Sequence, residues 1–165
     1  HFNLNNEIDI VMGTLSKAIG SLGGYVTGDN DLINYLRNKA RSFMYTTALP
    51  PAVCAASIAA INLIKRDPSI RESLWHNVRF INDNLKSLDF NVISSESPII
   101  PILIGDAQKA VDMSKSLYER GILIPAIRPP TVPVNSSRLR MTVMSTHTKE
   151  DLEILLEVLS EVQNL

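Results

Sequence analysis

The spacing of apolar residues along the chain predicts an alternation of helices and short strands. In residues 68–88, apolar side chains recur every three or four positions, which places them on one face of a helix. Comparable spacing, or a run of strong helix formers, predicts further helices over 30–40, 50–67, 107–121 and 148–163. Short apolar or β-branched runs predict strands over 8–13, 23–28, 42–51, 90–94, 99–105, 122–128 and 138–145.

Several helix ends carry recognisable signals. Asn30 or Asp31 is expected to cap the first helix, and Gly121 is expected to end the helix over 107–121. Thr148 is expected to cap the last helix, with Asp151 three residues further on to complete a capping box.

These elements divide into two parts, with a boundary near residue 60. Residues 1–60 have the pattern of the edge of an α/β layer, whereas 61–165 has that of a compact α+β unit with helices on one side of its strands. The helix over 50–67 is rich in alanine and has few polar positions on any face. We therefore expect it to be packed on several sides, or to lie at a subunit interface.

Composition and charge exclude some classes of function. The 165 residues are 45% hydrophobic and 20% charged, with a net charge of −1, so no basic surface favours binding to nucleic acid or to an anionic membrane. No apolar run reaches the ~18 residues of a spanning helix, and the polar first ten residues are unlike a signal peptide. We therefore expect a cytoplasmic protein.

The single cysteine and the histidines carry little chemistry. Cys54 excludes a disulfide within one chain, and its apolar surroundings predict a small buried residue rather than a nucleophile. His76 is expected on the solvent-exposed face of its helix, and His147 is expected in a loop. No spacing of histidine, cysteine and carboxylate residues suits a metal, so no metal site is expected.

Lys17 is the first candidate for chemistry, because it lies in the small-residue run GTLSKAIGSLGG between two predicted strands. A lysine amine is a nucleophile only when deprotonated, which burial or a cationic neighbour favours. Hydroxyls and backbone N–H groups in such a turn suit a phosphate, and glycines permit close approach. An amine that bonds to a carbonyl beside a phosphate cradle is what pyridoxal phosphate requires. The alternative is an ordinary exposed lysine in a turn.

Two threonines form the second candidate. Thr46 and Thr47 precede Pro50 and Pro51, and their adjacent hydroxyls could donate to a phosphate. Threonines in an extended segment are also simply good β formers, so this alternative stays open.

Arginines near the end of the chain form the third candidate. Arg128 precedes a proline-rich loop, and Arg138 and Arg140 should point to the same face of the strand over 138–145. An arginine on a rigid element can grip a carboxylate through two hydrogen bonds. The alternative is that all three are surface arginines.

Three segments together resemble the α-oxoamine synthases. They are DIVMGTLSKAIGSLGGYVTG, RSFMYTTALPPAVCAAS, and the stretch from PIIPILIGD through AIRPPTVPVNSSRLRMTVMSTHTKEDLEILLEVL. This family contains fold-type-I pyridoxal-phosphate enzymes that condense an amino acid with an acyl thioester and release CO₂. The resemblance implies an α/β fold in which 1–60 is the C-terminal remnant of the cofactor-binding large domain. Residues 61–165 would be the small C-terminal α+β domain.

The resemblance also implies which residues bind the cofactor. Lys17 matches the Schiff-base lysine, which also moves the proton at the substrate's α-carbon. Thr14 matches a phosphate contact on the same subunit. Thr47, with Thr46, matches a phosphate contact that reaches in from the second subunit of a homodimer.

On the substrate side, Arg140 matches the arginine that grips the amino-acid carboxylate, and Arg128 matches a substrate-side arginine on the same loop. The sequence AIRPPTVP is most similar to the biotin-pathway branch, which condenses L-alanine with a pimeloyl thioester. The alternative is a branch of the glycine C-acetyltransferase type.

Members of this family are more than twice as long as this chain. Their N-terminal part, to which no segment of this chain corresponds, normally supplies the aspartate that pairs with the pyridine nitrogen of the cofactor. Asp9 lies too close before Lys17 to take that role. We therefore expect the 165 residues alone to be inactive. A second hypothesis is a non-catalytic interaction module whose exposed apolar face leads to self-association.

Overall fold

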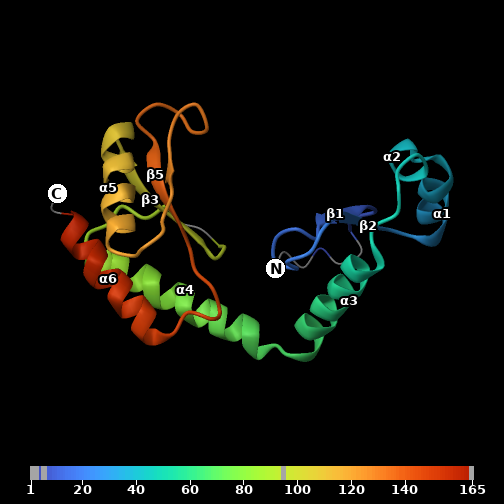
Figure 1. Cartoon of the computed structure of the whole chain (residues 1–165), viewed down its shortest axis with the longest axis horizontal. Coiled ribbons are helices and arrows are strands. Elements are labelled where there is room, and N and C mark those ends of the chain that lie inside the picture. Colours follow the sequence, from blue (N-terminus) through green and yellow to red (C-terminus); the bar gives the residue numbers. More distant parts are fainter. Residues whose placement is uncertain (1–3, 5–6, 94–95, 164–165) are drawn as a thin grey trace. The chain divides into compact units, whose positions relative to one another are not determined.

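The computed structural model describes residue 4 and residues 7–93 and 96–163, and it divides the chain into two compact units (Figure 1). Unit 1 is His1–Asp67 and unit 2 is Pro68–Leu165. Each unit is described by itself. Within the described residues, no helix is both long and apolar enough to cross a membrane.

Unit 1 contains a β-hairpin. Strands β1 (Val11–Thr14) and β2 (Gly24–Thr27) pair antiparallel, with Gly13 opposite Tyr25 and Thr14 opposite Gly24. Nearly all side chains of both strands are exposed, because two strands without a covering layer have no buried face. Both predicted strands exist, but β1 begins three residues after the start of the predicted range 8–13 and ends one residue beyond it, and β2 lies within the predicted range 23–28.

Helices α1 (Asn30–Lys39), α2 (Arg41–Met44) and α3 (Pro51–Arg66) complete the described part of unit 1. Asp29 caps α1, since its Oδ1 accepts a hydrogen bond from the N–H of Leu32 at 2.7 Å, so the predicted cap at Asn30 or Asp31 is wrong. Helix α3 begins at a proline, whose missing N–H would have had no partner in the first turn.

The prediction of a strand over 42–51 is wrong. Residues Arg41–Met44 form the single helical turn α2, and the segment that follows is irregular up to α3. The aromatic and threonine residues there favour a strand only where a neighbouring strand supplies a surface to pack on, and none pairs with them among the described residues.

Unit 2 is a three-stranded antiparallel sheet with helices (Figure 1). Its elements are α4 (Ser69–Ser87), β3 (Ile99–Gly105), α5 (Ala107–Glu119), β4 (Ala126–Ile127), β5 (Ser137–Thr142) and α6 (Lys149–Gln163). The strand order is β3-β5-β4. The predicted strand over 122–128 is reduced to the two residues of β4. In the predicted strand over 90–94, only Val92 forms a β-bridge, with Ile102, and residue 94 lies outside the described residues.

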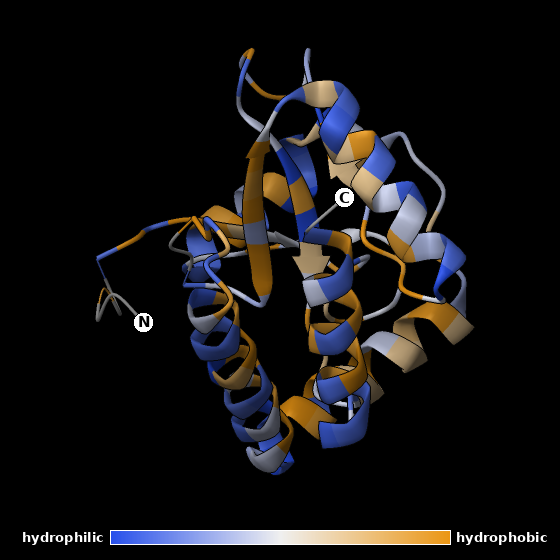
Figure 2. Ribbon diagram, turned by 90° about the vertical axis from the view of Figure 1, so that its left-hand side faces the viewer, coloured by the Kyte–Doolittle hydropathy of each residue, from blue (hydrophilic) through white to orange (hydrophobic). Residues whose placement is uncertain are grey.

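The hydrophobic core lies in unit 2. Alternate residues of β3 and β5 are buried, among them Ile100, Ile102, Leu139 and Met141, so one face of the sheet is apolar. The apolar stripes of α4, α5 and α6 supply the rest of this core. Figure 2 shows hydrophobic and hydrophilic residues alternating around the helices, as expected for helices with one buried face.

Two helix ends in unit 2 follow the sequence signals. The Thr148 N–H and hydroxyl both donate to Asp151 Oδ2 at 2.8 Å, and the Asp151 N–H donates back to Thr148 Oγ1 at 3.1 Å. Gly121 lies two residues beyond α5 with φ 83°, a conformation that costs glycine little. Both predicted end signals are confirmed.

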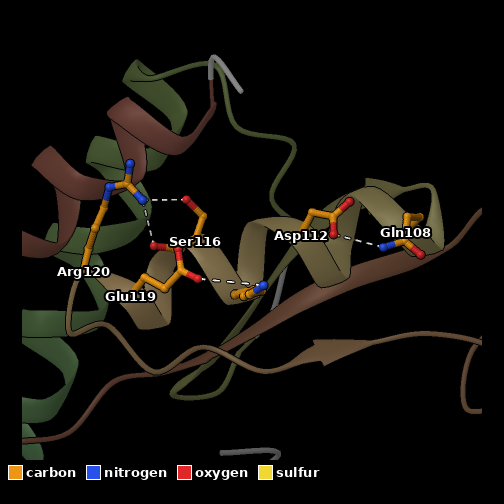
Figure 3. Close-up of polar contacts among 6 residues, drawn as sticks. Gln108, Asp112, Ser116, Glu119 and Arg120 are labelled. Atoms are coloured by element: carbon orange, nitrogen blue, oxygen red, sulfur yellow. Dashed lines mark hydrogen bonds and ion pairs between the residues drawn. The ribbon is translucent and has the colours of Figure 1, made fainter.

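The outer face of α5 is polar. Gln108 Nε2 donates to Asp112 Oδ1 at 2.9 Å, and Arg120 Nη1 donates to Ser116 Oγ at 2.6 Å (Figure 3). Each pair is four residues apart and therefore on one side of the helix.

Candidate functional site

Lys17 lies in the loop that joins the two strands of the hairpin. The loop is closed by backbone hydrogen bonds from Leu15 N–H to Gly23 O at 2.9 Å and from Ser21 N–H to Leu15 O at 2.8 Å. Within it, the Gly20 N–H donates to Lys17 O at 2.9 Å. The Lys17 side chain is exposed and has no ion pair with any described residue. The burial that favours a neutral amine is therefore not provided by the described residues.

Two hydroxyls lie at the start of the same loop. Thr14 Oγ1 and Ser16 Oγ are 2.7 Å apart, and the Ser16 N–H donates to Thr14 Oγ1 at 3.2 Å. Both side chains are exposed. Thr14, a predicted site residue, thus lies at the start of the loop that contains Lys17. Ser16, which the sequence analysis did not single out, lies beside it. Hydroxyl donors grouped in this way suit an anionic oxygen such as that of a phosphate.

Two glycines around the loop have a packing explanation within unit 1. A Cβ on Gly13 would lie 2.6 Å from the ring of Tyr25, which crosses over it from the neighbouring strand. A Cβ on Gly23 would lie 2.9 Å from Leu49, and Gly23 also has φ 104°. Gly23 is therefore favoured by its own backbone conformation, and a side chain at either position would have to displace the end of Tyr25 or of Leu49.

Thr46 and Thr47 lie in the irregular segment between α2 and α3. Both are exposed, and neither side chain makes a hydrogen bond to another described residue. From the same segment, Leu49 contacts Gly23 at the end of the Lys17 loop. No hydrogen bond joins either threonine to Lys17 or Thr14, all of which lie within the described residues.

The candidate arginines lie in unit 2, on and beside β5. The alternation of buried and open positions along β5 places Arg138 and Arg140 on the face opposite the core, as predicted. Arg140 is exposed, whereas Arg138 is half-buried and donates from Nε to Ser136 O at 3.0 Å. Arg128 directly follows β4, which pairs with β5 through Ile127 and Arg138. The Arg140 N–H donates to Pro125 O at 2.9 Å, so Arg140 lies beside the residue before β4 and Arg128 beside the other end of that strand. Both arginines are exposed.

The remaining candidates are not part of a site. Cys54 is exposed, so the prediction of a buried residue is wrong; helix α3 has few neighbours in unit 1 to cover it. Among the described residues, no group of histidine, cysteine and carboxylate side chains could hold a metal ion. The pKa of Asp151 is lowered, mainly by the hydrogen bond from the Thr148 backbone N–H and next by that from the Thr148 hydroxyl. These bonds belong to the capping box of α6 and not to a site.

Comparison with known proteins assigns a family. The family model for aminotransferase class I and II matches residues 1–159, and the chain therefore belongs to that family. Over 162 residues it is 47% identical to 8-amino-7-oxononanoate synthase from Thermoanaerobacter pseudethanolicus, which covers 98% of this chain and 41% of that protein. Over 165 residues it is 39% identical to serine palmitoyltransferase from Bacteriovorax stolpii, which covers 100% of this chain and 39% of that protein.

The fold is similar to that of a solved structure described as SPT with PLP internal aldimine. The TM-score is 0.93 at 28% identity, over 98% of this chain and 41% of that one. The predicted fold-type-I architecture and the resemblance to the α-oxoamine synthases are therefore confirmed. The chain spans about two-fifths of the length of the curated relatives it matches.

Proposed function

We propose that this chain carries the cofactor lysine and the substrate arginines of a pyridoxal-phosphate-dependent C-acyltransferase. The observation that supports this proposal most is the placement of Lys17, with an exposed amine, in a closed loop that begins with the paired hydroxyls of Thr14 and Ser16. That loop belongs to a chain of the aminotransferase class I and II family.

The donor groups present fit pyridoxal phosphate. Lys17 Nζ would hold the aldehyde carbon. The hydroxyls of Thr14 and Ser16 share one hydrogen bond at 2.7 Å, so the hydroxyl that accepts this bond would donate to a phosphate oxygen. When bound, the cofactor supplies an electron sink for the negative charge that develops at the substrate's α-carbon. Lys17 would then accept and return the proton at that carbon.

The other predicted residues have roles that follow from their charge and exposure. Arg140, exposed on β5, would bind the carboxylate of the amino acid, and Arg128 would bind the substrate from the adjoining loop. Thr46 and Thr47 are exposed and have free hydroxyls, so we propose that they serve the phosphate of a second copy in a homodimer.

For the substrates, we propose L-alanine and a pimeloyl thioester, giving 8-amino-7-oxononanoate in biotin biosynthesis. This proposal is supported by the 47% identity to the synthase from T. pseudethanolicus. Transfer of a palmitoyl group to serine is the second candidate, because 39% identity to a serine palmitoyltransferase extends over the whole chain. A glycine C-acetyltransferase reaction is the further alternative.

The test uses the complete polypeptide that carries this sequence. L-Alanine, L-serine and glycine are each combined with pimeloyl-CoA, palmitoyl-CoA and acetyl-CoA, and release of CoA and of CO₂ is measured. We expect the highest kcat/KM with alanine and pimeloyl-CoA, and loss of activity in Lys17→Ala. Preference for serine with palmitoyl-CoA would replace the first candidate by the second.

Lys17→Ala also serves as the control in a test of the 165 residues by themselves. We propose that these residues alone release no CoA from alanine and pimeloyl-CoA, because the resemblance assigns the aspartate for the pyridine nitrogen to no residue in this stretch. An absorbance band from the lysine–aldehyde adduct that disappears in Lys17→Ala would support a cofactor site. No band, together with self-association in sedimentation, would favour the interaction module for this stretch.

A further inference from the structure

A cluster of two serine hydroxyls connects the Lys17 loop to helix α3. Ser57 Oγ donates to Ser21 Oγ at 2.8 Å, and both hydroxyls lie within hydrogen-bond distance of the Val53 carbonyl oxygen, at 2.9 and 3.2 Å. Each hydroxyl carries one hydrogen, so the two serines and the carbonyl form one small closed network. Ser57 is 6% exposed and is the only buried residue of α3.

Ser21 is the point at which the loop is held from two sides. Its N–H donates to Leu15 O at 2.8 Å, which closes the loop around Lys17, while its hydroxyl contacts Ser57. The preceding Gly20 N–H donates to Lys17 O. The Lys17 carbonyl is therefore linked to α3 through the hydrogen bond from Gly20 and, one residue on, the hydrogen bond between Ser21 and Ser57.

A purely local role does not account for Ser57. A serine inside a helix commonly lies within hydrogen-bond distance of the carbonyl four residues earlier, and the 2.9 Å contact of Ser57 Oγ with Val53 O has this spacing. The contact with Ser21 joins residues 36 apart in sequence and links two different elements. Unit 1 has no buried apolar residue among those described, so few apolar contacts hold the loop in place. The hydrogen bond between Ser57 and Ser21 therefore has a larger share in fixing the loop.

We propose that Ser57 is a positioning residue for Lys17, which acts by holding Ser21 and thereby the loop over residues 15–23. This inference rests on the proposed role of Lys17 as the cofactor lysine. Displacement of a reacting group by ~1 Å can reduce a rate by ~100-fold, so a tether at the loop can matter without touching the cofactor. Ser57 is not itself a catalytic residue.

The experiment compares Ser57→Ala, Ser21→Ala, the double variant and Ser57→Thr in the complete polypeptide. Pyridoxal phosphate is added, the amine of Lys17 condenses with its aldehyde with loss of water, and borohydride reduces the C=N bond to a stable secondary amine. Mass spectrometry measures the rate of trapping at Lys17. We expect each alanine variant to be slower by about fivefold or more, the double variant to be no slower than either, and Ser57→Thr to keep most of the rate.

Hydrogen exchange supplies a readout that does not depend on the cofactor. The amides of Gly20 and Ser21 should exchange at least ~10-fold faster in Ser57→Ala, while amides of β3 and β5 stay unchanged. Ser137→Ala is the matched control: Ser137 is buried in unit 2, its hydroxyl has no hydrogen-bond partner, and the variant should behave as wild type in both measurements.

The outcomes separate this inference from the proposed function. If wild type is not trapped at Lys17, the proposed function fails, while the exchange of Gly20 and Ser21 still decides whether the tether exists. If wild type is trapped and Ser57→Ala shows the same trapping and exchange, the positioning role is overturned. It is also overturned if the effects of the two alanine substitutions simply add, or if exchange rises equally throughout the chain.

Discussion

The two units bury their side chains to very different extents. In unit 2, residues from α4, β3, α5, β5 and α6 form one apolar core, in which Ile81, Leu85 and Ile102 have no exposed surface. In unit 1, Ser57 is the only buried residue among those described, and large apolar side chains such as Met12, Phe43 and Tyr45 are more than 45% exposed. Unit 2 can thus stabilise its own fold, whereas unit 1 has little to stabilise it from within.

This difference separates stability from the proposed chemistry. The core of unit 2 positions Arg128 and Arg140 on a sheet whose other face is firmly packed. Lys17 and Thr14 lie on a two-stranded hairpin that is held by backbone pairing, by contacts such as Leu49 on Gly23, and by the Ser21–Ser57 network. The residue proposed to bind the cofactor therefore belongs to the unit that buries less of its own apolar surface.

The largest expected contrast is in hydrogen exchange of the 165-residue chain. Amides in the β3–β5 ladder, such as that of Ile102, should be protected on the order of a thousandfold or more, since they open only when the core of unit 2 unfolds. Amides of β1 and β2 should be protected about tenfold or less. Equal protection in the two sheets would show that unit 1 has a stability that its burial does not explain.

Matched isoleucine substitutions should show the same contrast in stability. Ile102→Ala removes a fully buried side chain and is expected to cost ~2–5 kcal/mol, while Ile58→Ala removes one that is 61% exposed and should cost less than ~1 kcal/mol. Urea unfolding followed by far-UV circular dichroism, which reports the helices of both units, measures both variants, and the fluorescence of Trp75, the single tryptophan and part of α4, follows unit 2 separately. A comparable loss in both variants would contradict the comparison.

The capping box of α6 should have a smaller effect on unit 2. Thr148→Ala is expected to lower its stability by ~1 kcal/mol, measured by the same urea curves. The Thr148 hydrogen bonds lower the pKa of Asp151 in the folded state, so their contribution is fully present above the usual carboxyl pKa of ~4 and is lost as the pH falls below it. Asp151→Asn should remove this part of the acid sensitivity; an unchanged pH profile would argue against it.

The polar outer face of α5 should contribute least. Gln108→Ala removes an exposed contact to Asp112, and Lys115→Ala removes an exposed pair with Glu119 whose atoms are 3.9 Å apart (Figure 3). Each should change the free energy of unfolding by less than ~0.5 kcal/mol. A loss above 1 kcal/mol in either variant would mean that this face is covered by something in solution.

Most of the elements of unit 2 could be predicted from the sequence, but fewer of those of unit 1. The apolar stripe of α4 and the Thr148–Asp151 box depend on residues close in sequence, so their patterns are readable directly. The segment 42–51 was predicted as a strand and contains a helical turn instead, since β propensity has no effect without a neighbouring strand. Cys54 was predicted as buried because the composition of α3 is apolar, yet burial depends on what covers a helix.

The candidate site was predicted in part. Lys17, Thr14, Arg128 and Arg140 were singled out by residue type and by resemblance, and their roles stay predictions. Ser16 and Ser57 were not singled out, because no local pattern distinguishes a serine that contacts another loop from an ordinary one. A possible signal for Ser57 was a lone hydroxyl in an otherwise apolar alanine-rich helix.

The sequence by itself determined the family, the helix ends that depend on local hydrogen bonds, and the faces of the amphipathic elements. Those features depend on residue type and short-range spacing, which are present in the chain before it folds. Only the tertiary structure decided that the buried apolar residues among those described lie in unit 2, that Tyr25 and Leu49 pack over the glycines near Lys17, and that Ser57 contacts Ser21. These depend on contacts between residues distant in sequence, which are formed only when the chain packs.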